Sequence, residues 1–570
     1  MDRALTIAAC LVATACAPSV ETVYTLTPPT WFEDGWSYYA VSSDGAWAVY
    51  GARFGARLIG LGPGPADTNR HASPGALRAA GGPAALITWG GEPPPGVTVP
   101  ENAVTRLSPG GTRLAVFLPG QTTLSAGPPD ALRRYEMDGV VTGLGWVTLG
   151  DLLYVLVLHP DGLSTLNRIN VETGTVHPMR EGLDAPHRFN ALAVSADSRA
   201  VYLALASDTV PAPADRHQPQ AERDTDIYAL DFANWRLQPV VDEPGDDFYP
   251  VIAGEYLYWT HNTFTDDVVA VPASGGEARV VVSGAQLPYW SPDGKELAYT
   301  IGGWRIADWA LNLDAAAVAV DDSARATSPP RPVVTGYHED FTPAWSPDGR
   351  WLAYHSHRAS LPVPSYASPG STDDIYLRRA DAPMDAELRL TDWGWEVGMA
   401  DWSPDSRRLV FDSWDRNGAA GVARPWIVTV DSATGGLTDR RRLTLPRGAD
   451  GTLLASWSPK SEEIALMVRE TSDRQALWIV SADGRTSRKV TEFTNTTYGG
   501  LDWSPDGQSL VYAALTGGRL QLFRVARTGG AATQLTREPA DLLHPQVSPD
   551  GRWIAATRSV HGKVLRRLKL

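Results

Sequence analysis

Cysteine is almost missing from this chain. Of its 570 residues only Cys10 and Cys16 are cysteines, and both lie close to the first residue. A disulfide framework and a zinc site built on cysteines are therefore excluded for everything after Cys16. The folded part has to be stabilised by packing and hydrogen bonds.

Basic residues are too few for a partner with a phosphate backbone. The chain has 50 lysines and arginines against 65 aspartates and glutamates, which gives a formal net charge of −15. Such a chain repels a phosphate backbone, so we expect no nucleic acid among its partners. The basic cluster Arg440-Arg441-Arg442 adjoins a predicted strand, and we interpret it as a solvated hairpin edge.

Long apolar segments are missing as well. The run from Ala4 to Ala15 is too short to cross a bilayer as a helix, but it fits the core of a signal peptide. Ala13-Thr14-Ala15 matches the small-x-small cleavage pattern, and Cys16 follows at once. Residues 1–16 thus resemble a bacterial lipoprotein signal, which implies export to the periplasm or outer membrane and lipidation of Cys16. Plain secretion after Ala15 is the alternative, and we expect membrane contact through a lipid anchor only.

Turn-forming and aromatic residues are abundant. The chain contains 53 glycines, 44 prolines and 21 tryptophans, which suits an all-β repeat protein better than a helical one. One pattern recurs at intervals of 44 to 57 residues, the length of a four-stranded propeller blade with variable loops. Its copies are Trp290-Ser291-Pro292-Asp293-Gly294, Trp345-Ser346-Pro347-Asp348-Gly349, Trp402-Ser403-Pro404-Asp405-Ser406, Trp457-Ser458-Pro459-Lys460, Trp503-Ser504-Pro505-Asp506-Gly507 and Val547-Ser548-Pro549-Asp550-Gly551.

The residues of this pattern predict a tight turn between two strands. Proline fixes φ, aspartate bonds its own backbone, and glycine adopts the left-handed conformation that closes a hairpin. The tryptophan before the turn is expected to pack between neighbouring blades. Weaker copies in the first half, such as Ser195-Ala196-Asp197-Ser198, extend the repeat toward the amino terminus.

The repeated pentapeptide resembles the TolB-like repeat of β-propellers. The resemblance implies an all-β fold of tandem β-propellers. From the strand pattern we expect two six-bladed rings of four-stranded blades, and a single large ring or a division into six and seven blades is the alternative. Residues 20–275 would form the N-terminal propeller and residues 276–570 the C-terminal one. The strand Ala278 to Val282 is expected to complete the last blade, and the strand Glu21 to Thr25 a blade that runs from Asp246 to Pro272.

Several residues are candidates for a binding site. Asp246, Asp247 and Asp340 precede inner strands, whose starts line the mouth of a propeller channel, so these carboxylates could face a basic ligand or only cap turns. Trp393 and Trp395 have the spacing to share one face of a strand, where they could stack on a sugar or pack within a blade.

Histidines in one blade suggest an alternative function, that of a metal-dependent enzyme. His355 and His357 are two residues apart on a predicted strand, and His338 lies nearby with Glu339 and Asp340. Such a group could hold a divalent ion, as in propeller-shaped polysaccharide lyases, or it could consist of ordinary blade-end polar residues.

A non-catalytic role is our main expectation. A Gly-x-Ser-x-Gly elbow is absent from the sequence, and the residues after the last repeat are needed for strands, which argues against a peptidase of the dipeptidyl-peptidase type. We expect an exported scaffold that binds an envelope protein or peptide, with no cofactor. The rivals are a metal-assisted lyase or hydrolase of acidic oligosaccharides and a rigid platform with no ligand of its own.

Overall fold

The computed structural model describes most of the chain between residues 20 and 570. The described residues are 20–25, 39–41, 47–52, 55–61, 68–72, 104–108, 111–118, 121–147, 150–159, 163–185, 190–206, 225–301, 314–334, 340–356, 374–381, 386–393, 397–413, 423–431, 433–449, 451–471, 474–494 and 499–570. Every element within these ranges is a β-strand. A search of the same ranges for a helix with the length and apolarity of a membrane span found none.

Five four-stranded sheets follow one another from residue 285 to residue 534. Each is antiparallel and runs in chain order, as the repeat pattern predicts. They consist of β22 (Ala285–Trp290), β23 (Glu296–Ile301), β24 (Asp314–Ala319) and β25 (Arg331–Val334); β26 (Asp340–Trp345), β27 (Trp351–Ser356), β28 (Asp374–Arg379) and β29 (Glu387–Arg389); β30 (Asp401–Trp402), β31 (Arg408–Ser413), β32 (Arg424–Val430) and β33 (Leu437–Arg442); β34 (Thr452–Trp457), β35 (Glu463–Arg469), β36 (Arg474–Ser481) and β37 (Ser487–Thr494); β38 (Leu501–Trp503), β39 (Ser509–Thr516), β40 (Arg519–Ala526) and β41 (Thr533–Gln534).

Four further sheets make up the N-terminal half of the described chain. They consist of β2 (Tyr39–Val41), β3 (Trp47–Ala52), β4 (Gly55–Gly60) and β5 (Thr68–Ala72); β6 (Val104–Leu107), β7 (Leu114–Phe117), β8 (Thr123–Gly127) and β9 (Arg133–Glu136); β10 (Val140–Trp146), β11 (Leu152–Leu158), β12 (Ser164–Asn170) and β13 (Thr175–Leu183); β15 (Ala193–Val194), β16 (Ala200–Ala206), β17 (Thr225–Asp231) and β18 (Arg236–Pro239). The short strand β14 (Asn190–Ala191) pairs in parallel with β10.

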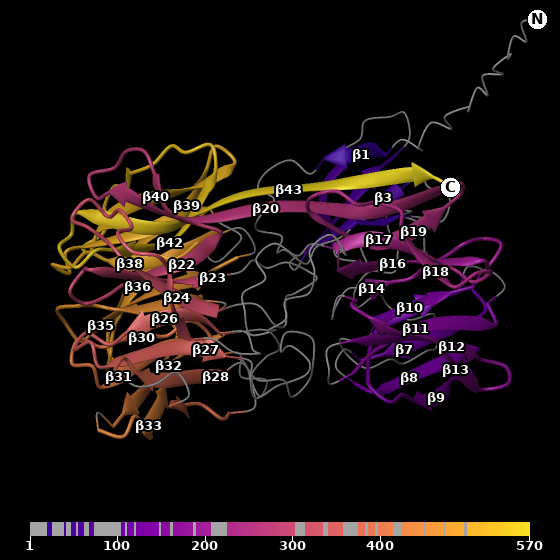
Figure 1. Cartoon of the computed structure of the whole chain (residues 1–570). Helices are drawn as coiled ribbons and strands as arrows, with labels where there is room; N and C mark the ends of the chain where they lie inside the picture. The colour runs from indigo at the N-terminus through magenta and orange to yellow at the C-terminus, as the bar shows by residue number, and fades with distance from the viewer. Residues whose placement is uncertain are drawn as a thin grey trace, which may run out of the picture.

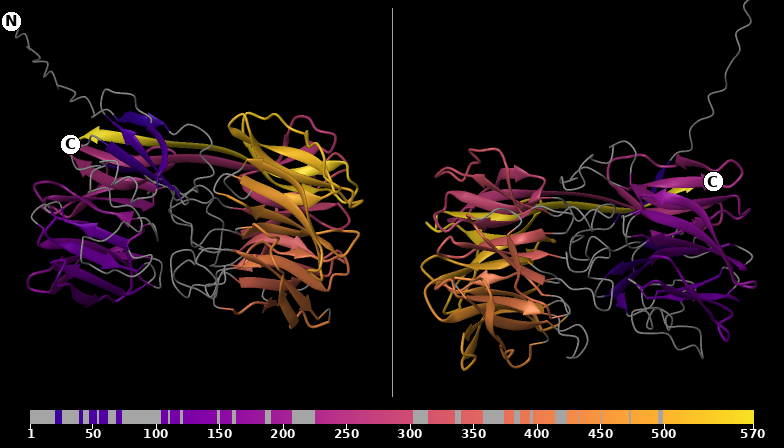
Figure 2. Two further views of the ribbon diagram at one scale, coloured as in Figure 1. Left: turned by 180° about the vertical axis from the view of Figure 1, so that it is seen from behind. Right: turned by 60° about the horizontal axis from the view of Figure 1, so that its bottom comes forward.

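A tenth sheet belongs to both halves of the molecule. Its strands are β1 (Glu21–Thr25), β19 (Asp246–Ala253), β20 (Tyr256–Pro272), β21 (Arg279–Ser283), β42 (Asp541–Val547) and β43 (Trp553–Lys569). β20 and β43 pair without a register shift from Tyr256 opposite Lys569 to Pro272 opposite Trp553. Figure 1 shows this two-stranded ribbon running from one group of sheets to the other, and the views of Figure 2 agree.

This sheet corrects the expected ends of the two rings. β1 does join the sheet of β19 and β20, but it pairs with β43, in the order β1-β43-β20-β19. β21 likewise joins the last repeat by pairing with β20, in the order β42-β43-β20-β21. Both halves of the molecule therefore contain part of β20 and part of β43. The boundary near residue 276 and the number of blades in the N-terminal ring stay predictions.

The Trp-Ser-Pro-Asp-Gly segments form the turns that the sequence predicts. In the copy at Ser346, the hydroxyl Oγ accepts a hydrogen bond from the backbone N–H of Trp351 at 3.0 Å and donates to Asp348 Oδ1 at 2.6 Å. Gly349 has a φ of 71°, the left-handed conformation that glycine adopts at little cost. The weaker copy at Ser195 keeps the same bonds, with Ala200 N–H donating to its hydroxyl at 2.9 Å.

Three of the tryptophans that precede these turns connect neighbouring sheets through hydrogen bonds. The indole N–H of Trp402 donates to Ala344 O of the preceding sheet at 3.1 Å, and Trp503 bonds Ser456 O in the same way at 3.2 Å. Trp290 donates to Gln546 O of the last sheet at 3.1 Å, so the repeat contact also joins the end of the circle to its start.

The hydrophobic core lies between the sheets. Six clusters of buried side chains fill the six junctions between consecutive sheets from β22 to β43, and one of them packs β22 to β24 against β20 and β43. These six sheets thus form a closed circle, which we call the C-terminal ring. Four more clusters join the sheets of β2 to β19, which we call the N-terminal sheets. The predicted all-β propeller fold is confirmed.

Candidate functional site

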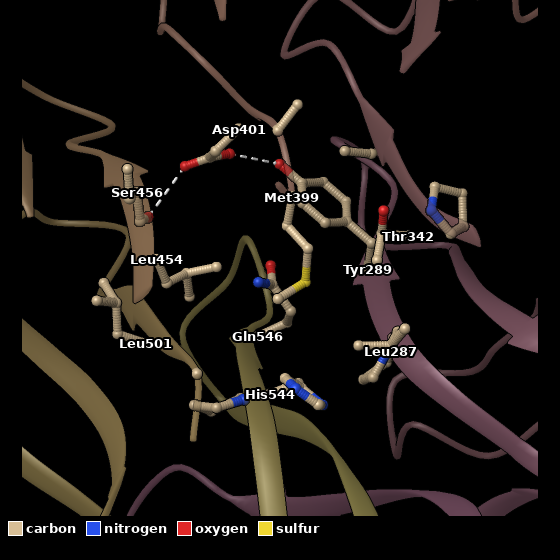
Figure 3. Close-up of a pocket in the computed structure, with 17 residues that line it drawn as sticks. Leu287, Tyr289, Thr342, Met399, Asp401, Leu454, Ser456, Leu501, His544 and Gln546 are labelled. Carbon is tan, nitrogen blue, oxygen red and sulfur yellow. Dashed lines mark hydrogen bonds between the residues drawn. The ribbon is translucent and has the colours of Figure 1, made fainter. Parts of the chain in front are cut away.

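A hollow lies at the centre of the C-terminal ring. Corresponding positions on the inner strands of all six sheets line it, and the side chains of Met399, Leu454 and Gln546 point into it (Figure 3). The lining combines apolar and polar groups. Its residues are Leu287, Pro288, Tyr289, Thr342, Pro343, Ala344, Met399, Ala400, Asp401, Leu454, Ala455, Ser456, Gly500, Leu501, His544, Pro545 and Gln546.

Three inner strands bulge where they face the hollow. Leu287, Thr342 and His544 have φ values of 53°, 54° and 48°, and a proline follows each of them. This left-handed conformation is costly for a residue other than glycine, and it is disfavoured before proline. The neighbouring sheets hold it in place: Leu287 N–H donates to Thr557 Oγ1 at 2.9 Å, and His544 N–H donates to Gly499 O at 2.8 Å. The bulges interrupt the pairing of the inner strands with their partners at these positions.

Asp401 connects three sheets across the hollow. Its Oδ1 accepts a hydrogen bond from the Tyr289 hydroxyl at 2.9 Å, and its Oδ2 accepts from Ser456 Oγ at 2.9 Å and from Trp457 N–H at 2.7 Å (Figure 3). Tyr289 belongs to the sheet of β22, two places away from the sheet of Asp401. Asp502, two sheets further along the ring, makes a related contact with the sheet that follows its own, because its Oδ2 accepts from Val547 N–H at 2.7 Å.

The ionisable groups around the hollow resist becoming charged. Burial raises the pKa of the Asp502 carboxyl to about 8, with a further contribution from the nearby charge of Asp401. Burial also raises the pKa of Asp401, opposed by its hydrogen bonds. The pKa of His544 is lowered by burial to about 4, so the imidazole is neutral at pH 7. The hollow thus offers hydrogen-bonding groups with little net charge, apart from Asp401.

The one serine of the hollow's lining is Ser456, and its hydroxyl donates to the carboxylate of Asp401 at 2.9 Å.

One protein-family model matches part of the C-terminal ring. The model described as "TolB beta propeller domain" matches residues 437–567, which span β33 to most of β43. This range contains the last three Ser-Pro turns and includes Asp502 and His544. The chain carries TolB-like β-propeller repeats.

Known proteins share part of this TolB-like chain. It is 31% identical to the uncharacterized peptidase YuxL of Bacillus subtilis over 216 residues, which make up 37% of this chain and 28% of that protein. It is 28% identical to an uncharacterized protein of Agrobacterium fabrum over 29% of this chain and 51% of that protein. The chain thus spans about a quarter and about half of their lengths. The solved structure of a putative TolB from Agrobacterium tumefaciens is 20% identical, with a TM-score of 0.38, over 52% of this chain and 99% of that one.

The predicted carboxylates lie at the starts of inner strands but are enclosed. Asp246, Asp247 and Asp340 are each at most 1% exposed. Asp246 Oδ1 accepts from Thr225 N–H at 3.2 Å and from the Thr225 hydroxyl at 3.3 Å, which connects β19 to the preceding sheet. This is the contact of a capping residue, the other interpretation of these aspartates. Ligand binding by Asp246, Asp247 and Asp340 stays a prediction.

The histidine group of the enzymatic alternative is only partly described. His338, Glu339 and His357 lie outside the described residues. His355 is 2% exposed, and its ring contacts Phe341 edge-on at 5.0 Å. The register places Asp340 opposite Ser356 and Phe341 opposite His355, so the side chains of Asp340 and His355 point to opposite faces of the sheet. Metal binding by His338, His355 and His357 stays a prediction.

Trp393 packs within the ring. It lies between β29 and β30 and outside any strand, which corrects the expected strand face, and Trp395 lies outside the described residues. The Trp393 ring contacts Trp426 at 5.0 Å and Phe411 at 5.5 Å between ring centroids, and Arg440 lies over it at 5.1 Å. Its observed contacts are those of blade packing, and stacking on a sugar stays a prediction. Cys16 also lies outside the described residues.

Sequence reasoning missed the residues that form the hollow. A signal was present, because Asp401-Trp402 and Asp502-Trp503 repeat the same pair before Ser-Pro, and Leu287-Pro288, Thr342-Pro343 and His544-Pro545 repeat at corresponding positions. Taken one at a time, such pairs look like ordinary parts of a turn or strand. Their alignment across the repeats marks the inner surface of the ring.

Proposed function

We propose that this protein is a non-catalytic, exported β-propeller scaffold that binds an extended protein segment or peptide in the bacterial cell envelope. The hollow of the C-terminal ring would receive that segment. The composition of the hollow supports this most directly: Leu287, Met399 and Leu454 supply apolar surface beside the hydroxyl, amide and carboxyl groups of Tyr289, Gln546 and Asp401. Apolar walls with a few oriented polar groups are typical of binding sites.

The size of the hollow favours a narrow ligand. It contains about 530 Å³ of space, including open solvent at its mouth. Because that figure includes open solvent, the enclosed space is smaller, so the hollow admits a narrow group and not a folded domain. The weakly charged lining suits apolar and amide groups better than a strongly charged ligand.

Export and lipid anchoring form part of this proposal. They rest on the apolar run Ala4 to Ala15 and on Cys16 after the cleavage pattern Ala13-Thr14-Ala15. Mass spectrometry of the mature amino terminus distinguishes a lipidated Cys16 from an unmodified end. An intact Met1 on protein from the native host would contradict export.

A displayed library of random twelve-residue peptides tests the binding function. We expect the purified chain to enrich related peptides, and the substitution Gln546→Trp, which fills the hollow, to weaken their binding at least about tenfold. Calorimetry with one synthetic peptide from the selection measures the change. Val280→Ala is the matched control, because Val280 is 39% exposed on β21, away from the hollow lining.

The outcome separates the proposal from its rivals. A well-folded preparation that enriches no peptide would favour a platform without a ligand of its own. Peptides that bind Gln546→Trp and Val280→Ala equally well would move the binding site away from the hollow.

A further inference from the structure

A second group of polar residues lies in the N-terminal sheets, and none of its members lines the hollow. Asp247 on β19 is opposite His261 on β20, and the Nδ1 atom of His261 lies 2.9 Å from Asp247 Oδ1. Glu243 precedes β19 in the chain. One possible ligand atom from each of Glu243, Asp247 and His261 lies within 4.8 Å of the others.

The Asp247 carboxylate is incompletely satisfied. The residue is fully buried, and its Oδ1 accepts hydrogen bonds from Trp259 Nε1 at 2.5 Å and from His261. Its Oδ2 is buried and has no hydrogen-bond partner among the described residues. A buried carboxylate oxygen without a partner is costly, and a bound cation is one way to remove the cost. Burial raises the pKa of Asp247 to about 6, in keeping with this shortage of positive charge.

We propose that Glu243, Asp247 and His261 bind one Zn²⁺ ion. One imidazole nitrogen and two carboxylate oxygens form a ligand set that zinc accepts, and three protein ligands leave a coordination position open. Calcium prefers six to eight oxygen ligands, so the imidazole favours zinc over calcium. Trp259 keeps its hydrogen bond to Oδ1 and so orients the carboxylate, as supporting hydrogen bonds do around metal ligands.

The site is open to solvent on one side, and a nearby arginine competes with the ion for one of its ligands. The side chains of Asp247 and His261 are 0% and 7% exposed, whereas that of Glu243 is 31% exposed, so an ion enters beside Glu243. Arg566 on β43 places its Nη1 atom 3.0 Å from Glu243 Oε1. The arginine occupies the carboxylate that the ion needs and repels a cation. Arg566 therefore lowers the affinity for zinc, and its removal raises that affinity.

Zinc titration of the untagged full-length chain tests the proposal. After dialysis against a chelator, we expect calorimetry with zinc chloride to show one bound ion per chain. His261→Ala weakens binding at least about tenfold, while His177→Ala, an exposed histidine on β13, leaves it unchanged. Arg566→Gln tightens binding at least about threefold.

Each result either supports the site or overturns it. A chain that binds no zinc, or binds it equally well with His261→Ala and His177→Ala, overturns the proposal. So does displacement of the zinc by an equal concentration of calcium. If His261→Ala fails to fold, Glu243→Gln at the more exposed ligand replaces it, and unchanged binding there is equally contrary. Peptide binding in the C-terminal ring is measured separately and does not affect this result.

Discussion

Buried aspartates join the inner strands of the C-terminal ring. Asp502 accepts hydrogen bonds from Trp503 N–H at 2.8 Å and from Val547 N–H at 2.7 Å, so one carboxyl group connects two sheets. Asp401 does the same two sheets earlier, through Trp402 and Trp457. Because burial disfavours the ionised form, these contacts make the stability of the ring dependent on pH.

The raised pKa of Asp502 predicts that the free energy of unfolding falls as the pH rises toward 8. Its folded-state pKa is about 8, above the value of about 3.9 for an exposed aspartate, so between these values the folded chain holds a proton that the unfolded chain has released. The free energy of unfolding therefore decreases with rising pH and levels off above pH 8. We expect Asp502→Asn to make this decrease smaller, by up to about 1.4 kcal/mol for each pH unit.

Urea unfolding between about pH 6.5 and pH 8 measures this slope. Below about pH 6.5, His544 acts in the opposite sense, because its pKa is lowered to about 4 in the folded chain. Asp412, with a pKa raised to about 7, contributes equally to both proteins. Asp506→Asn, in an exposed turn where Ser504 lowers the carboxyl pKa, is the control that keeps the original slope. A slope unchanged by Asp502→Asn would contradict the prediction.

At the scale of the strand pair, the repeated turn determines where the first two strands of a blade meet. The Ser346 hydroxyl bonds both arms of its turn, at Trp351 and at Asp348, while Gly349 N–H donates to Ser346 O at 2.8 Å. The hydroxyl is fully buried, so its removal leaves Trp351 N–H without this acceptor.

Ser346→Ala should therefore destabilise the ring by about 1 to 3 kcal/mol, the usual cost of an unsatisfied buried donor. The midpoint of chemical denaturation measures the loss. Ser487→Ala, at an exposed position of β37, should change the free energy of unfolding by less than about 0.5 kcal/mol. Equal midpoints for the two variants would show that the hydroxyl does not stabilise the turn.

The strands near each turn could be predicted from sequence, and the most distant pairings could not. Serine, proline, aspartate and glycine act within five residues, so the turn and both its strands are encoded locally. β20 and β43, in contrast, pair residues about 300 positions apart, such as Tyr256 and Lys569. No local pattern shows that one strand will extend through two groups of sheets, although both segments are 17 residues long.

The candidate sites depended still more on register. Asp247 was singled out from its place before an inner strand, but His261 was not, because the pairing of β19 with β20 includes a bulge that sequence does not reveal. The same holds for Asp340 and His355, because only the register shows that their side chains lie on opposite faces of the sheet. The hollow required the ring itself, since Tyr289 and Asp401 meet across a sheet that separates them along the chain.

At the scale of the whole molecule, the end of the chain stabilises its beginning. The last residues of β43 lie between β1 and β20, and the C-terminus is next to the N-terminal sheets (Figure 1). Arg567 also pairs with Glu21 on β1 at 2.7 Å. The N-terminal sheets therefore acquire this strand only after the last repeat has been synthesised, which makes their final stability depend on residues of that repeat.

Leu565 tests this dependence because it is fully buried on β43, within a cluster that also contains Ala48, Ala253 and Tyr258. Leu565→Ala should cost about 2 to 5 kcal/mol, the usual range for a buried leucine. Hydrogen exchange should accelerate in β19 and in β20 as far as Asn262, and remain slow in β34 to β36 of the C-terminal ring. Leu570→Ala, five residues on and 48% exposed, should leave both regions unchanged. Equal acceleration in both regions would mean that the ribbon of β20 and β43 makes the two halves unfold as one unit.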